Sequence, residues 1–138
     1  MLKDGAERVP DGVDPILWAF VRLGDSGVGA TVTVQIDGAL VSGEIISGKR
    51  YLEAIAAGFA KATVRCEDTS LSEKDAETLV DSFARSLTAL APKVGRMPYL
   101  HLKNATIRTS GDGRVHADAW RGRLDAVTAI VFGVPSDG

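Results

Sequence analysis

The sequence has few cysteines and no long apolar runs. Cys66 is the only cysteine among 138 residues, which excludes a disulfide framework and any zinc site built from several cysteines. The longest apolar stretch, 126–134, is far shorter than the roughly 20 residues that a membrane-spanning helix requires. The polar N-terminus lacks the apolar segment of a signal peptide. We therefore expect a cytoplasmic protein without a membrane segment.

The chain also lacks a large excess of charge of either sign. Its formal net charge is −2, with 45% hydrophobic and 25% charged residues, a composition that excludes a disordered chain. It also argues against a protein whose whole surface binds nucleic acid. A mass of 14.5 kDa fits one domain. We assign that domain to residues 1–138 and expect 1–12 and 135–138 to fray.

Apolar spacing predicts three helices, over 14–24, 48–62 and 72–92. Asp14 and the following proline supply an N-cap and a first-turn residue for the first helix, and Gly24 is predicted to end it. The third helix has a capping signal at its start and apolar residues at a regular three-four spacing, the clearest amphipathic pattern in the chain.

A two-residue periodicity predicts strands in the remaining sequence. Residues 32–36 alternate apolar and polar side chains, and Asp37-Gly38 then predicts a type I′ hairpin turn into a returning strand over 40–47. Gly43 is predicted to be a bulge or bend in that strand. Three further strands are predicted over 99–108, 114–124 and 127–134.

This order of elements predicts an α+β protein. It has an N-terminal helix, a mostly antiparallel, bent five-stranded sheet, and a two-helix insertion between strands 2 and 3. Because glycines such as Gly43 and Gly122 permit sharp bends, we expect the strands to close into a small Sm/SH3-like barrel. An open sheet with helices on one face is the alternative.

No pattern in the sequence identifies a catalytic site. Residues 43–49 match a phosphate-binding loop, but Arg50 stands where magnesium coordination needs Ser or Thr, so we interpret the segment as a strand end followed by a helix start. His101, His116 and Asp118 are candidate metal ligands by residue type. Strands routinely place polar residues on their solvent face, and this is the interpretation we favour for them. We expect no enzyme, no catalytic residue, no metal and no cofactor.

Charge is distributed unevenly along the chain. Residues 1–90 contain 9 basic and 14 acidic side chains, whereas residues 91–138 contain 7 basic and 4 acidic ones. Five cations on the predicted strands form a candidate interaction patch that would dock an acidic surface or a second copy of the chain. In the alternative interpretation these cations only solvate exposed strands and block edge pairing. The five are Lys103, Arg108, Arg114, Arg121 and Arg123.

Three segments together resemble the gas vesicle accessory protein U family. They are VTVQIDGALVSGEIISGKRY at 32–51, PYLHLKNA at 98–105 and WRGRLDAVTAIVFG at 120–133. The resemblance implies a non-enzymatic accessory protein that acts by protein–protein interaction in the assembly or clustering of gas vesicles. Implied partners are gas vesicle shell or accessory proteins and a second copy of the chain, and the implied location is cytoplasmic and vesicle-associated.

A second resemblance is architectural. The order of helix, strand, Asp-Gly turn and bent strand is similar to that of Sm-like small barrels, which typically form rings and bind RNA. This resemblance implies an alternative function, an oligonucleotide-binding barrel. The chain lacks a recognisable uridine-pocket motif, and its acidic half argues against RNA. We therefore expect nucleic acid not to be the partner.

Overall fold

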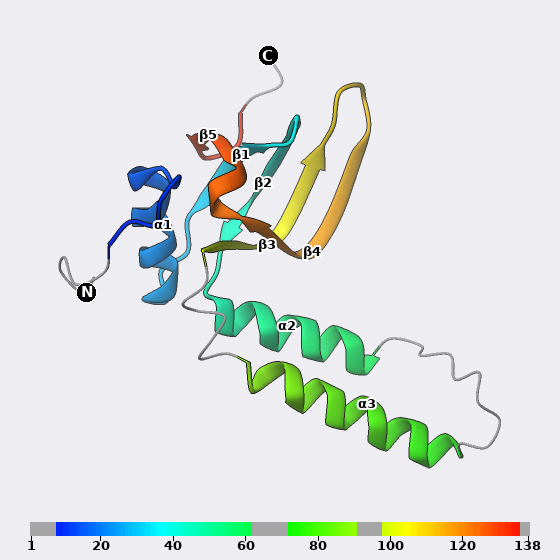
Figure 1. Ribbon diagram of the computed structural model, residues 1–138. Helices are drawn as coiled ribbons and strands as arrows, with labels where there is room; N and C mark the ends of the chain where they lie inside the picture. The colour runs from blue at the N-terminus through cyan, green and yellow to red at the C-terminus, as the bar shows by residue number, and fades with distance from the viewer. Residues whose placement is uncertain (1–7, 62–71, 91–97, 136–138) are drawn as a thin grey trace.

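The computed structural model describes residues 8–61, 72–90 and 98–135. Cys66 and parts of both predicted frayed ends lie outside these residues. The helices and strands follow one another in the predicted order (Figure 1). The elements are α1 (Pro15–Asp25), β1 (Thr31–Ile36), β2 (Ala39–Ile45), α2 (Gly48–Lys61), α3 (Glu73–Thr88), β3 (Tyr99–Arg108), β4 (Arg114–Arg123), the 3-10 turn η1 (Leu124–Ala126) and β5 (Val127–Phe132).

Helix α1 begins where the sequence predicts and ends slightly later. The Asp14 carboxylate accepts a hydrogen bond from the Ile16 N–H at 2.8 Å, so the predicted N-cap is confirmed. The prediction that Gly24 ends the helix is wrong, because the helix continues to Asp25. Gly24 instead faces the core: a Cβ at this position would lie 2.7 Å from Cγ2 of Ile45. The glycine therefore allows close approach of α1 to the sheet.

Strands β1 and β2 form the predicted hairpin. Asp37 and Gly38 have φ values of 48° and 78°, the two left-handed conformations that a type I′ turn requires. The register between β2 and β3 shifts between Ser42 and Glu44, so the predicted bulge at Gly43 is confirmed.

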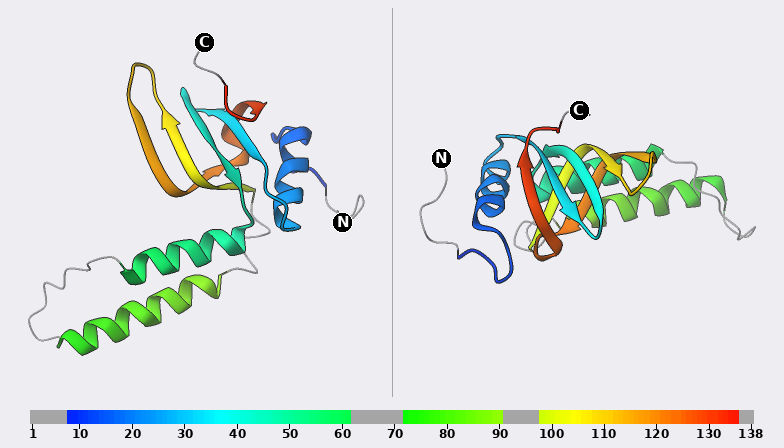
Figure 2. Two further views of the ribbon diagram at one scale, coloured as in Figure 1. Left: turned by 180° about the vertical axis from the view of Figure 1, so that it is seen from behind. Right: turned by 90° about the horizontal axis from the view of Figure 1, so that it is seen from above.

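Helices α2 and α3 form an antiparallel pair that projects from one end of the sheet (Figure 2). The hydroxyl of Ser72 accepts a hydrogen bond from the Asp75 N–H at 3.1 Å, which confirms the capping signal of α3. Helix α2 contacts β3, β4 and α3. Helix α3 has α2 as its main contact and contains no buried residue. We call this pair the helical arm.

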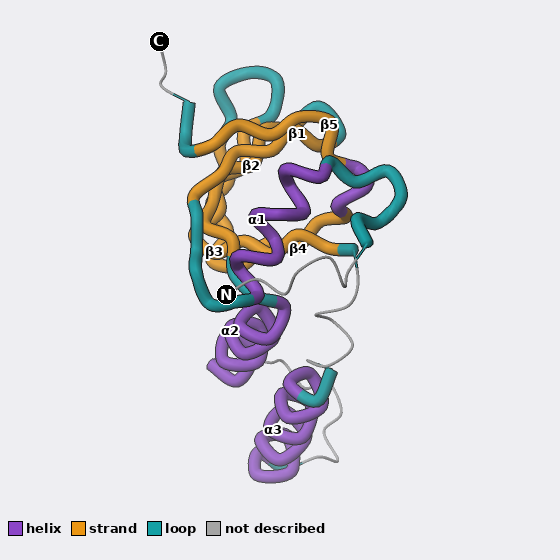
Figure 3. The backbone as a smooth tube through the Cα atoms, turned by 90° about the vertical axis from the view of Figure 1, so that its left-hand side faces the viewer, coloured by secondary structure: helices purple, strands orange, loops and turns teal. Residues whose placement is uncertain are grey.

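The five strands form one antiparallel sheet in the order β4-β3-β2-β1-β5. This confirms the α+β class, but the expectation of a closed barrel is wrong: among the described residues, β4 pairs only with β3 and β5 only with β1. Figure 3 gives the physical reason, since α1 lies inside the curl of the sheet. The two edge strands are joined by η1 and remain apart, so the sheet is open.

The hydrophobic core lies between α1 and the concave face of the sheet. Leu17 and Val21 of α1 belong to one cluster with buried side chains of β1, β2, β3 and η1, and partly buried side chains of β4 and β5 pack against this cluster. Each fully buried side chain of this size stabilises the fold by about 2 kcal/mol relative to leaving it exposed. The core therefore fixes which face of β3 and β4 is directed outward. The largest fully buried side chains are Leu17, Val32, Val34, Val41, Ile45, Leu100, Leu102 and Leu124.

Candidate functional site

The five predicted cations lie on the outer face of β3 and β4, opposite the core. Leu100 and Leu102 point into the core, so the alternation of a strand directs Lys103 outward. Asn104, with φ of 51°, interrupts the alternation, and Ala105 points back into the core. Arg108 therefore also points outward. Residues directly opposite on neighbouring antiparallel strands share a face.

The strand register then places the cations of β4. Arg121 lies opposite His101, Arg123 opposite Tyr99, and Arg114 opposite Arg108. Arg114 and Arg121 are seven residues apart along β4, which corresponds to about 23 Å in an extended strand. The structure thus does not gather the five cations into one cluster. It divides them between the two ends of the strand pair, with Lys103 between.

At the end nearest α2, the two arginines are engaged by neighbours within the chain. The Arg121 guanidinium carbon lies 3.7 Å from the centroid of the Tyr99 ring, a cation–π contact. Arg123 donates two hydrogen bonds to the Asp125 carboxylate, at 3.0 and 2.7 Å. These hydrogen bonds and the negative charge of Asp125 raise the pKa of Arg123 further. A partner would meet partly compensated charge here.

Lys103 is compensated in a similar way. Its ammonium lies 3.6 Å from the carboxylate of Glu44 on the neighbouring strand β2, and both side chains are 41% exposed. An exposed ion pair of this length contributes up to about 1 kcal/mol. It nevertheless reduces the positive charge at the centre of the outer face.

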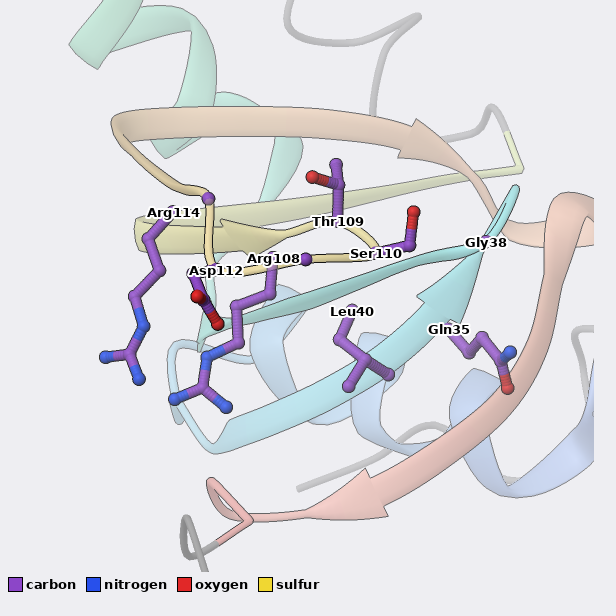
Figure 4. A pocket seen from close by; sticks show the side chains of 10 residues that line it. Gln35, Gly38, Leu40, Arg108, Thr109, Ser110, Asp112 and Arg114 are labelled. Carbon is purple, nitrogen blue, oxygen red and sulfur yellow. The ribbon is translucent and has the colours of Figure 1, made fainter.

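At the opposite end, Arg108 and Arg114 line a cleft between the tips of the two hairpins. The cleft has a volume of about 750 Å³, and its walls come from the β1–β2 turn region and from residues 108–114. Figure 4 shows the two arginine side chains lying next to each other and pointing the same way, with Asp112 beside them. Leu40, which is 40% exposed, contributes an apolar wall.

A second cleft adjoins the first along the outer face of the sheet. Its volume is about 310 Å³, and Arg108 and Arg114 line this cleft as well. Its remaining lining is mostly polar, from Ser42, Asn104 and Thr106 among others, together with Val134. The two arginines therefore stand where the clefts meet. Together with Asp112 and Leu40 we call this region the arginine cleft.

Sequence reasoning identified the two arginines and missed the cleft. Arg108 and Arg114 flank the turn 109–113 symmetrically, so a hairpin there had to place them opposite each other. The Asp37-Gly38 turn had to lie at the same end of an antiparallel sheet. Combining these two turns would have predicted that both tips enclose a space next to the arginine pair.

His101 is the only histidine buried among the described residues, and it lies where α2 meets the sheet. It is 4% exposed, its ring centroid is 4.8 Å from that of Tyr51, and its Nε2 atom has no hydrogen-bond partner among the described residues. Burial lowers the pKa of His101 to about 4, with the nearby Arg121 charge as a second cause. The imidazole is therefore neutral near pH 7.

The candidate metal ligands do not converge. His116 lies opposite Thr106, well along the strand pair from His101, and its Nε2 atom contacts the exposed Asp118 carboxylate at 3.3 Å. Across the part of the chain that the structure describes, no group of three His, Cys, Asp or Glu side chains is arranged to hold a metal ion. The residues named in the sequence analysis therefore form no metal site together.

The segment resembling a phosphate-binding loop is the junction between β2 and α2. The hydroxyl of Ser47 accepts a hydrogen bond from the Arg50 N–H at 3.1 Å, as a residue preceding a helix commonly does. This confirms the interpretation as a strand end followed by a helix start.

The sequence profile of a protein family described as "Gas vesicle protein GvpU-like" matches residues 14–135. This range includes every helix and strand of the structure. No curated protein matches the chain. Within the described ranges, no helix combines the length and the apolar character needed to cross a membrane.

Proposed function

Because the chain belongs to the GvpU-like family of gas vesicle proteins, we propose that it is a non-enzymatic accessory protein that binds vesicle shell or accessory proteins. The binding serves vesicle assembly or clustering in the cytoplasm and requires no metal or cofactor. In this proposal the candidate interaction patch, Lys103, Arg108, Arg114, Arg121 and Arg123, faces an acidic surface of the partner. The arginine cleft is the centre of that contact.

The observation that supports the cleft is the direct pairing of Arg108 with Arg114 at the edge of a concave surface. Two adjacent guanidinium groups concentrate positive charge, which the Asp112 carboxylate beside them reduces in part, and each presents a planar set of donors that matches a carboxylate. Leu40 beside them offers apolar contact. An acidic side chain of the partner, flanked by an apolar one, fits this combination.

The three other cations contribute in a different way. Tyr99, Asp125 and Glu44 engage them within the chain, and none of the three cations lines the arginine cleft. Their positive field still covers the outer face and steers an acidic partner toward it. We therefore expect charge reversal at the cleft to increase the dissociation rate, and charge reversal at Arg121 and Arg123 to slow association.

Co-sedimentation with purified gas vesicles tests this assignment. The double variant Arg108→Glu/Arg114→Glu is expected to lose most of its binding, and Arg121→Glu/Arg123→Glu to lose less. The control Arg50→Glu/Arg85→Glu makes the same change in net charge on exposed helix positions of the arm and is expected to bind like the wild type. Binding of the cleft variant at the wild-type level would refute the proposal.

Stability measurements distinguish a binding role from a structural one. Arg121 and Arg123 are exposed, and substitutions at such positions change the free energy of unfolding by within about 0.5 kcal/mol. We expect the melting temperature of Arg121→Glu/Arg123→Glu to remain close to that of the wild type. A large decrease would show that these arginines hold the strand pair together.

A salt series with single-stranded RNA tests the alternative function. The alternative was based on a closed barrel, and the sheet is open. We therefore expect weak binding or none. Tight binding that falls steeply with salt concentration would indicate phosphate contacts. The partner of this face would then be RNA and not an acidic protein.

A further inference from the structure

The two edges of the sheet differ in how they are protected. Edge strand β4 has four charged side chains and His116 in ten residues. Edge strand β5 reads VTAIVF, with no charged residue, proline or glycine. Natural sheets usually protect an exposed edge with charges, prolines or bulges, because its free N–H and C=O groups accept a further strand. Strand β5 has no charge or proline of this kind, and its one register shift against β1 lies at Thr128, between Ala129 and Val127.

The free hydrogen-bonding groups of β5 can be assigned from its pairing with β1. The Gly133 N–H donates to the Thr31 carbonyl at 2.8 Å. Bonded and non-bonded pairs alternate along an antiparallel ladder, so Val131, opposite Thr33, bonds to β1. Phe132 lies between these two bonded positions and Ile130 lies on the other side of Val131, so both belong to non-bonded pairs. Their N–H and C=O groups consequently point away from β1, to the free edge.

An apolar surface adjoins this edge. Phe132 is 72% exposed, and its ring stacks on Phe20 of α1 with the centroids 5.8 Å apart. Ile16 is 62% exposed and lies one helical turn before Phe20, on the same side of α1. Val131, on the opposite face of the strand, is 50% exposed. Apolar side chains therefore extend from the free strand edge onto the helix next to it.

We propose that β5 is a dimerisation strand, which pairs antiparallel with β5 of a second copy of this chain. The best partner for this uncharged, apolar edge is an extended segment that is itself uncharged and apolar. Among the described strand edges, β5 itself has that composition. Two copies of β5 carry no charges that repel each other. The charged side chains of β4 make that edge a poor partner.

The backbone directions restrict the dimer to registers that pair outward-facing residues with each other, and we choose the register centred on Ile130. A two-fold axis at Ile130 brings the outward groups of the two Ile130 residues together and places Phe132 opposite Thr128 of the second copy. The resulting interface is the same patch on both chains. It continues the five-stranded sheet of one copy into that of the other and brings the two Phe20–Phe132 stacks to its two ends.

A pair of variants at one position isolates the backbone hydrogen bond. Phe132→Ala and Phe132→Pro both remove the ring, but only the proline removes the outward N–H. Sedimentation of the full chain from about 1 µM to about 1 mM, the range of weak to moderate affinities, is expected to show dimers for the wild type. Phe132→Ala is expected to form weaker dimers. Phe132→Pro is expected to dimerise at least about tenfold more weakly than Phe132→Ala, a difference of 1.4 kcal/mol.

Melting in dilute solution shows whether Phe132→Pro still folds. If it does not, amide exchange in the wild type decides the question: exchange at Ile130 and Phe132 is expected to slow as the concentration rises, while Val131 is protected throughout. A wild-type monomer across the range, equal dimerisation of the two variants, or closed rings of more than two copies would each overturn the proposal. None of these measurements uses vesicles, so the result is independent of vesicle binding.

Discussion

Helices α1 and α3 are both amphipathic, yet one belongs to the core and the other does not. Helix α1 buries Leu17, Val21 and Gly24 against the sheet, whereas α3, with the more regular apolar spacing, buries no residue. Leu79 and Phe83 of α3 remain 57% and 49% exposed. An apolar periodicity therefore tells which side of a helix is apolar, but not how much of that side another element covers.

The difference follows from what each helix can contact. Helix α1 lies in the curl of a five-stranded sheet, while α3 has α2 as its main contact. In the second case the centroids of Phe59 and Phe83 are 4.8 Å apart, but two helices alone enclose little volume. We therefore expect the arm to contribute less to global stability than its sequence pattern indicates, and to open locally.

Matched leucine truncations should show the largest contrast. Leu17→Ala removes a side chain that is 0% exposed and should lower the free energy of unfolding by about 3 kcal/mol, since such cavities rarely collapse. Leu79→Ala in the arm should change it by within about 0.5 kcal/mol. Urea denaturation measures both. Equal losses would show that the arm is as tightly packed as the core.

Acid should weaken the junction between the arm and the sheet at His101. The folded-state pKa is about 4, below the unfolded value of about 6.5, so the folded state binds fewer protons. Stability is fully present above pH 6.5 and is lost as the pH falls toward 4, by up to about 3 kcal/mol.

The variant His101→Phe keeps a ring against Tyr51 without a titrating group. It should therefore show a smaller decrease in unfolding free energy between pH 6.5 and 4 than the wild type. Denaturation at a series of pH values measures the difference. Identical pH profiles would place the acid sensitivity elsewhere.

A glycine-to-alanine substitution should change the free energy of unfolding in opposite directions in α1 and in the arm. Gly24→Ala directs a Cβ to within 2.7 Å of Cγ2 of Ile45, which is 1% exposed, and should cost about 1–2 kcal/mol through overpacking. Gly58→Ala in α2 meets nothing within 4 Å and should gain about 0.5–1 kcal/mol from helix propensity. Thermal melting measures both shifts. A stabilising Gly24→Ala would mean that α1 can move away from the sheet.

The smallest expected effect concerns the helix caps. Ser72→Ala removes the α3 cap and should cost about 1 kcal/mol, seen as faster amide exchange within α3 while exchange in the sheet is unchanged. Asp14→Ala removes the equivalent cap of α1. It should instead lower the global stability measured by denaturant. If Ser72→Ala accelerated exchange in β3 as well, the arm and the sheet would unfold as one unit.

Local patterns predicted most elements, because their causes are local. The Asp37-Gly38 turn and the Asp14 and Ser72 caps depend on residues within a few positions of each other. Gly24 was misassigned because the reason for a glycine there is Ile45, a side chain distant in sequence. The closed barrel failed for a similar reason, since α1 occupies the space across which β4 and β5 would have met.

The candidate site also combines features that local sequence predicts with features that depend on residues distant in sequence. The cations could be listed from the sequence, and the arginine pair follows from the turn between its strands. The partners that compensate Lys103 and Arg121 could not be predicted, because Glu44 lies on another strand and Tyr99 at the far end of a hairpin. Which neighbours engage each cation is therefore a property of the tertiary structure, and Arg108 and Arg114 also have interactions within the chain.

The pairing of β1 with β5 has a consequence for biosynthesis. The Thr33 hydroxyl donates a hydrogen bond at 2.8 Å to the carbonyl of Gly133, 100 residues further along the chain. Translation delivers β1 long before β5, so a nascent polypeptide carries an incomplete sheet until residues up to Gly133 have left the ribosome. Premature termination before β5 would release a chain with β1 as a bare edge, a species prone to aggregate or to be captured by chaperones.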